Sequence, residues 1–323
     1  MIGRATAVAA ALMAAAWAPT AATASSTNKT ETGSTSDILE SVAAPYVYLR
    51  SDVASIEASP VTTAARMREI HHLLASHDPE AMATSFVAYA ALVAADTPAF
   101  AEGIEKALGR RQRNRDDFLR QLATDPMSVQ NMQGGNEAIA AIMMMSAADA
   151  TRIGALGNRF IDNAYSMQGQ AWARGRLKTD GMSRVRGASE YAQQRTWPIT
   201  GSTSAIMSKG GTYRPNLVAD ELWTMAWSPE MEPPNPNSSA GAMLTRALIL
   251  AARYATDSLT EADIDAYAKS RPTQRCFVSA KLNFDQCIAA TRTPYEEAFC
   301  IGTHGLNDVS RCVGWPAGAG ATQ

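Results

Sequence analysis

The sequence predicts a mostly α-helical protein, an antiparallel helical bundle with an irregular insertion and a disulfide-linked C-terminal helical hairpin. Three observations favour this fold class. Alanine and methionine are abundant while aromatic residues make up 7% of the 323 residues, a mix that favours helix over strand. Apolar residues recur at spacings of three to four along much of the chain. All four cysteines lie in the last fifth of the sequence.

The first 24 residues have the features of a secretory signal peptide. Arg4 supplies a positive charge, residues 5–17 are small and mostly apolar, and Ala22-Thr23-Ala24 offers a small-x-small cleavage pattern before Ser25. An uncleaved anchor is the alternative, but Pro19 interrupts an apolar run shorter than the roughly 20 residues that span a bilayer. We therefore expect a soluble mature protein, periplasmic or extracellular, without a transmembrane segment.

The mature chain divides into a leader, a helical domain and a cysteine-rich end. Residues 25–36 are rich in Ser, Thr and Asn and predict a flexible leader, because so few apolar residues cannot offset the entropy of ordering. Residues 37–270 predict the helical domain, and residues 271–323 a disulfide-linked hairpin packed on it. The formal charge of −2 becomes −3 when Arg4 is removed, which gives no electrostatic reason to expect a nucleic-acid partner.

Individual helices are indicated by their start signals and apolar faces. A capping residue directly before proline indicates a helix start at Asp78-Pro79, Thr97-Pro98 and Asp125-Pro126. Longer helical patterns follow from Asn136, from Ala240 to Tyr254 and from Leu259 to about Ser270.

Periodicity fades between residues 178 and 239, where glycine, proline, serine and threonine accumulate. A segment of roughly 60 residues without a clear pattern is unusual in a compact domain and is often functional. Trp197, Tyr213 and Trp223 lie within it and are the candidate binding residues. If this segment covers a pocket with converging catalytic groups, the protein is a periplasmic hydrolase; if it wraps the bundle as a strap, the protein is a scaffold.

The cysteines predict two disulfides, because their number is even in an exported chain and no short metal-binding spacing is present. Cys276 and Cys287 are eleven residues apart, which places both on one face of a continuous helix but too far apart to bond to each other. Thr293-Pro294 with Glu296 predicts a second helix after a tight turn. Nested pairing of Cys287 with Cys300 and of Cys276 with Cys312 is therefore favoured, while other connectivities stay open.

The segment from Cys276 to Trp315, with Cys300-Ile301-Gly302-x-His304-Gly305, resembles the tail of uncharacterised exported proteins of Gram-negative bacteria. The resemblance implies export and helicity and brings no activity with it. The nested pairing also looks like that of small twin-cysteine helical hairpins, although the cysteine intervals of ten and eleven residues differ from the usual nine.

Other polar clusters have simpler interpretations than chemistry. His71, His72 and His77 lack a metal-binding spacing and are expected to face solvent or cap helices, so no metal and no cofactor is predicted. Four arginines between residues 110 and 115 precede two aspartates, which predicts local pairing on a solvated helix. No short catalytic motif is present, so the enzyme question stays open. The leading hypothesis is a helical binding or scaffold protein of the cell envelope, with an unidentified envelope protein or a small ligand as partner.

Overall fold

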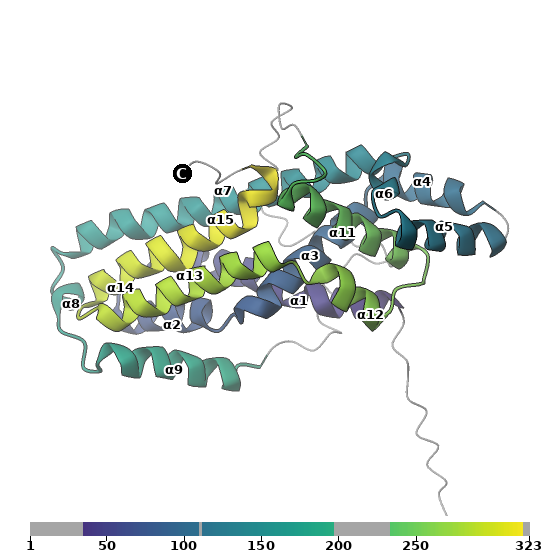
Figure 1. Cartoon of the computed structure of the whole chain (residues 1–323). Helices are drawn as coiled ribbons and strands as arrows, with labels where there is room; N and C mark the ends of the chain where they lie inside the picture. Colours follow the sequence, from purple (N-terminus) through teal and green to yellow (C-terminus); the bar gives the residue numbers. More distant parts are fainter. Residues whose placement is uncertain (1–34, 110–111, 197–232, 319–323) are drawn as a thin grey trace, which may run out of the picture. The chain divides into compact units, whose positions relative to one another are not determined.

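Helices supply all the regular secondary structure of the residues that the computed structural model describes, 35–109, 112–196 and 233–318 (Figure 1). The bundle is mostly α, as the sequence predicts. The elements are α1 (Thr35–Ala58), α2 (Ala64–Ala75), α3 (Pro79–Ala95), α4 (Pro98–Leu108), α5 (Gln112–Thr124), α6 (Ser128–Asn131), α7 (Gly135–Met167), α8 (Ala171–Arg174), α9 (Gly181–Gln194), α11 (Ser239–Ala255), α12 (Glu261–Asp263), π-helical η2 (Ile264–Ala268), α13 (Arg271–Ala290), α14 (Pro294–Cys300), π-helical η3 (Ile301–Asp308), α15 (Val309–Gly314) and the 3-10 turn η4 (Trp315–Ala317).

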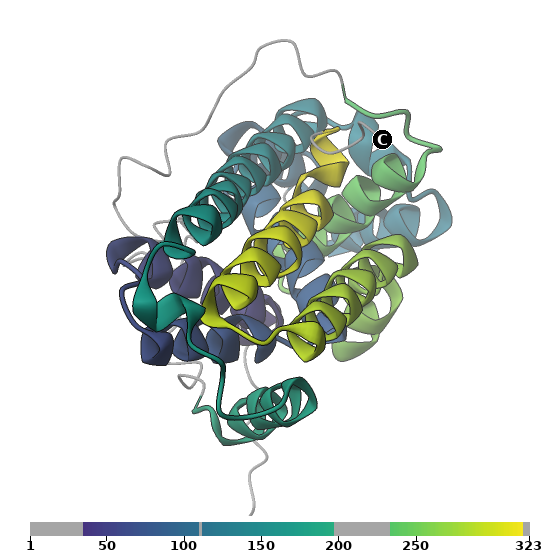
Figure 2. The same ribbon diagram turned by 90° about the vertical axis from the view of Figure 1, so that its left-hand side faces the viewer.

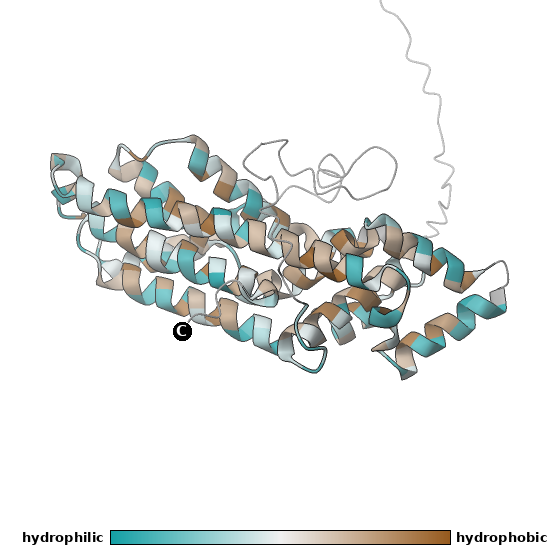
Figure 3. Cartoon of the chain, turned by 90° about the horizontal axis from the view of Figure 1, so that it is seen from above, coloured by the Kyte–Doolittle hydropathy of each residue, from teal (hydrophilic) through white to brown (hydrophobic). Residues whose placement is uncertain are grey.

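Helix α3 lies at the centre of the packing, and 12 of its 17 residues are buried. It begins as predicted, because the Asp78 carboxylate accepts hydrogen bonds from the N–H groups of Glu80 and Ala81 while Pro79 occupies the first position. Helices α1, α7, α11 and α13 pack against it. In Figure 3 hydrophobic and hydrophilic residues alternate along most of the helices, the pattern of amphipathic helices that bury one apolar stripe.

Helix α7 is the longest element of the described chain and is long and apolar enough to cross a membrane. Helices α3 and α4 are long and apolar enough to cross a membrane only if they are counted as one span, but their axes are bent by 77° at the break between them. In α7, however, 61% of the most apolar window is buried inside the protein, against α3, η3 and α15 among others. A core helix of a bundle passes the same length and composition test.

Helices α13 and α14 form the predicted hairpin, with the turn at residues 291–293. Two disulfides join its arms in the nested arrangement. The outer bridge links Cys276 to Cys312 with a Cα–Cα distance of 5.5 Å, and the inner bridge links Cys287 to Cys300 with 5.6 Å. Both distances lie in the range of unstrained disulfide geometry.

The π-helical segment η3 explains how both bridges reach across one interface. Cys276 and Cys287 are eleven residues apart, three α-helical turns plus about 20°, and so share a face of α13. Cys300 and Cys312 are twelve apart, which in a regular α-helix would turn Cys312 by about 120° away from Cys300. A π-helical insertion absorbs one extra residue. Segment η3 therefore brings both cysteines back onto the face that α13 presents.

The expectation of an irregular segment from residue 178 to 239 is wrong at its start. Helix α9 occupies Gly181–Gln194 and packs on α2 and α13 (Figure 2). Its fully buried residues are Gly181, Arg184 and Ala188, and only Val185 and Tyr191 add partly buried apolar surface to the face it presents to the bundle. Hydrophobic periodicity therefore had little to detect.

A second correction concerns Asp125-Pro126, where a helix start with proline at its first position was predicted. The chain makes a turn there, and α6 begins at Ser128 and spans only four residues. Glycine at 134 and 135 follows, and α7 begins at Gly135.

Candidate functional site

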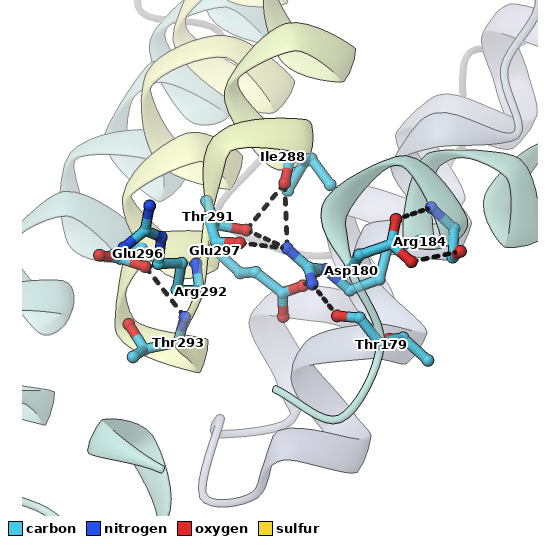
Figure 4. A network of polar contacts seen from close by, with 10 residues as sticks. Thr179, Asp180, Arg184, Ile288, Thr291, Arg292, Thr293, Glu296 and Glu297 are labelled. Carbon is cyan, nitrogen blue, oxygen red and sulfur yellow. Dashed lines mark hydrogen bonds and ion pairs between the residues drawn. The ribbon is translucent and has the colours of Figure 1, made fainter. Parts of the chain in front are cut away.

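The turn of the hairpin is held by a buried polar network that reaches it from α9 (Figure 4). The Arg184 guanidinium donates hydrogen bonds to the carbonyl oxygen of Thr291 at 2.7 Å and to its hydroxyl at 2.6 Å. It also donates to the carbonyl oxygens of Ile288, at 3.1 Å, and Thr179, at 2.5 Å. The network ties the C-terminal end of α13 and the start of α9 to one side chain.

The same guanidinium forms an ion pair with Glu297 of α14, at 2.7 Å between Arg184 Nε and Glu297 Oε1. The Glu297 residue is 1% exposed. Burial raises the pKa of Glu297, and the positive charge of Arg184 opposes that rise. The buried ion pair makes the α9 contact specific, because separating Arg184 from Glu297 would leave a buried carboxylate without its hydrogen-bonded cation.

The backbone of the preceding loop and of α9 also lies against the hairpin turn. The Leu177 N–H donates to the Arg292 carbonyl oxygen at 2.8 Å. A Cβ atom at Gly181 would lie 1.8 Å from the Ala289 carbonyl oxygen, so only glycine allows the start of α9 to approach this closely. The loop before α9 and the start of α9 therefore both contact the hairpin turn.

On the other side of the turn a hollow of about 280 Å³ opens between the C-terminal end of α7 and the hairpin; we call it the hairpin pocket. Its lining includes the inner disulfide and three aromatic side chains, Tyr165 from α7 and Tyr295 and Phe299 from α14. Tyr165 is 63% exposed and Phe299 39%, and they are two of the four large apolar residues with high exposure in the described chain. Exposed aromatic rings around a hollow are typical of a ligand site.

Glu296 is the acidic residue in the lining of the hairpin pocket. Its Oε2 atom accepts hydrogen bonds from the N–H groups of Arg292, at 2.5 Å, and Thr293, at 2.9 Å. These bonds are the predicted cap of α14 and hold the carboxylate at the turn. The pocket walls are therefore fixed by the inner disulfide, by this cap and by the Arg184 network behind the turn.

A second and smaller hollow, of about 30 Å³, lies between α2, α13 and η3 and is lined by His77 and His304. His77 Nε2 lies 2.7 Å from Asp52 Oδ2, and His304 Nδ1 lies 2.8 Å from Asp308 Oδ2. This volume is enough for about one or two water molecules rather than a substrate. Nowhere in the described part of the chain do three His, Cys, Asp or Glu side chains gather as a metal site requires.

Asp52 also binds Arg195, the residue just beyond α9. The guanidinium donates to both carboxylate oxygens, at 2.7 and 2.8 Å, in the bidentate arrangement that arginine favours. Burial alone would raise the pKa of Asp52, but the hydrogen bonds from His77 and Arg195 outweigh it and lower the pKa. This cluster fixes the end of α9 to α1.

A third polar cluster lies inside the bundle. The Tyr46 hydroxyl donates to Asp149 Oδ2 at 2.8 Å, and Arg50 forms an ion pair with Asp149 Oδ1 at 3.1 Å. Arg50 also contacts the Tyr89 hydroxyl. Burial raises the pKa of both Tyr46 and Asp149. The group links α1, α3 and α7 to one another.

The structure pairs the four cysteines as predicted. It does not test the predicted binding site formed by aromatic residues. Trp197, Tyr213 and Trp223 lie outside the described residues. Sequence reasoning missed the hairpin pocket, because Tyr165 belongs to an apolar stripe that reads as core. The one available signal was the spacing of Tyr295 and Phe299, which share a face of α14 one turn apart.

The expected surface position of the histidines is wrong. His71 is fully buried and His77 nearly so, while the ring of His72 lies 5.3 Å from that of Tyr191. On α2, His71 packs against Phe284 of α13 and His72 against Tyr191 of α9, while His77 lies beyond the end of the helix and pairs with Asp52.

The arginine cluster is only partly described. Arg113 lies 3.8 Å from Asp117, the expected local pairing, whereas Arg115 donates to the backbone carbonyls of Thr256 and Asp257 beyond α11.

Comparison of the chain with protein families, with curated proteins and with solved structures found no match.

Proposed function

We propose that this chain is an exported binding protein of the cell envelope and that the hairpin pocket is its ligand site. The two disulfides indicate an oxidising, non-cytoplasmic environment. Export through a signal peptide that ends at Ala24, and residence in the periplasm, are the simplest route to that environment for this sequence.

The observation that carries the binding proposal is the hairpin pocket itself. It combines exposed aromatic rings with walls fixed by a disulfide, and its volume of about 280 Å³ is near the lower end of ligand pockets. A small ligand or a small apolar group of a larger one fits such a hollow. Preorganised walls lower the entropic cost of binding, so a ligand site benefits from them more than a scaffold surface does.

The test uses the neutral fluorescent dye N-phenyl-1-naphthylamine, which brightens in apolar surroundings. The purified mature protein should bind the dye, and Phe299→Ala should weaken binding by about 1 kcal/mol, or roughly fivefold. The matched control is Leu282→Ala, since Leu282 is 54% exposed and lies outside the pocket. Dye binding that is absent, or that responds equally to both substitutions, contradicts the proposal.

Export is tested separately. The protein recovered from outside the inner membrane should begin at Ser25 and contain no free thiols. A chain that keeps residue 1, or that is found reduced in the cytoplasm, contradicts this part of the proposal.

A further inference from the structure

The chemistry of the hairpin pocket narrows the class of ligand, and this inference rests on the proposed function. Two features of the lining matter. Three of its side chains are aromatic, with Tyr295 and Phe299 one turn apart on α14 and Tyr165 across from them at the end of α7. Glu296 is the one side chain in the described lining that is charged at neutral pH.

Two arginines lie near the turn, Arg292 within it and Arg184 on α9, and neither belongs to the described lining of the pocket. The Arg184 guanidinium is buried behind the turn and is paired with Glu297, as Figure 4 shows. Its remaining donors are used by backbone carbonyls and the Thr291 hydroxyl. No lysine, arginine or histidine side chain belongs to the described lining of the pocket.

Aromatic faces attract cations, and a fixed carboxylate adds to that attraction. The carboxylate of Glu296 is held in place by two backbone N–H groups, so it does not have to be ordered when a ligand binds. A methylated ammonium combines a positive charge with an apolar surface, which suits a lining of aromatic rings and a disulfide beside one acidic residue. We propose that the hairpin pocket binds a small quaternary ammonium group.

The experiment compares choline with its uncharged isostere 3,3-dimethylbutan-1-ol, each titrated into the unmodified mature protein and followed by ligand-observed NMR. The two molecules have nearly the same shape, so the comparison isolates the charge without any change to the protein. Choline should bind about tenfold more tightly, as expected for combined cation–π and carboxylate attraction at a partly exposed site.

Two substitutions then assign the effect to residues. Glu296→Gln keeps an acceptor oxygen for the cap but removes the charge, and it should lower choline affinity while leaving the alcohol unchanged. Phe299→Leu keeps an apolar side chain but removes a ring face, and it should weaken choline binding by about threefold. Circular dichroism of both variants checks that the helices are intact.

The outcomes separate the two proposals. Equal binding of choline and the alcohol, or no response of choline affinity to Glu296→Gln, overturns the ammonium inference and leaves the apolar pocket in place. Failure of choline, the alcohol and the neutral dye to bind at all overturns the proposed function as well.

Discussion

Arg184 provides the most direct test of how the hairpin turn is held. Replacing it with methionine keeps the apolar stem and removes every hydrogen-bond donor. Glu297, which is 1% exposed, then loses its cation, and the carbonyl oxygens of Thr179 and Thr291 lose a donor. Removing one partner of a buried ion pair costs about 3–5 kcal/mol. At roughly 2 °C per kcal/mol for a protein of this size, the melting temperature should fall by about 6–10 °C.

The matched control for this prediction lies on the same helix. Arg186 is exposed on α9, and Arg186→Met should change stability by no more than about 0.5 kcal/mol. Thermal unfolding followed by circular dichroism measures both variants, and hydrogen exchange shows whether α9 detaches before the bundle unfolds. The reasoning is refuted if the two variants melt at the same temperature and α9 exchanges alike in both.

The stability of the Arg184→Met variant should also depend on pH in a defined direction. Burial raises the pKa of Glu297 above its ordinary value of 4.5, and loss of Arg184 raises it further. A carboxyl group with a raised folded-state pKa binds more protons in the folded protein, so stability falls as pH rises above about 4.5. The deficit of the variant should therefore shrink as pH is lowered from 7 toward 4.5. A deficit that is constant with pH would mean that Glu297 does not carry the buried charge.

Three further predictions concern the bundle. Replacing the two cysteines of one bridge by serine should lower the free energy of unfolding by about 4 kcal/mol for the outer bridge and about 3 kcal/mol for the inner bridge, because the outer bridge closes a longer loop. Denaturant titration of the two double variants measures both values. Burial lowers the pKa of His71 to about 3, so the folded state excludes a proton that the unfolded state accepts below 6.5, and stability is lost as pH falls through this range. His71→Phe should reduce that loss by up to about 1.4 kcal/mol per pH unit, and unchanged slopes between pH 6.5 and 4 would contradict it. Gly302→Ala should destabilise, because its Cβ would lie 2.6 Å from a carbonyl oxygen of α7, whereas Gly187→Ala, which meets nothing within 4 Å, should stabilise α9 by about 0.5–1 kcal/mol; equal effects in thermal unfolding would refute the close packing.

Local signals in the sequence predicted the elements that local interactions determine. The start of α3 follows from the Asp78 cap with Pro79, and the hairpin follows from Thr293-Pro294 with Glu296. Helix α4 begins at Pro98 as predicted, although the Thr97 side chain makes no capping hydrogen bond. In each case the residues that specify the element are adjacent, so no knowledge of the rest of the fold is needed.

The missed features depend on partners that are distant in the chain. Helix α9 is held to the hairpin through Arg184, whose partners Ile288 and Thr291 are more than 100 residues away in the sequence. The hairpin pocket combines Tyr165 with Phe299, which a bundle contact alone brings together. The burial of His71 likewise follows from the helices that cover α2. A spacing rule on one segment cannot detect any of these arrangements.

The distribution of crosslinks bears on function as well as on stability. A domain of nearly 300 residues buries enough apolar surface to fold without disulfides, unlike the small secreted domains that depend on them. Here both bridges, the cap at Glu296 and the Arg184 network hold the same hairpin, and the inner bridge itself lines the pocket. The inner bridge fixes α14 against α13, and the outer bridge fixes α15 against α13. Constraints concentrated around one hollow are more useful for holding its aromatic rings in place than for holding the bundle together, which is why the hairpin pocket is the part of the molecule to test for binding.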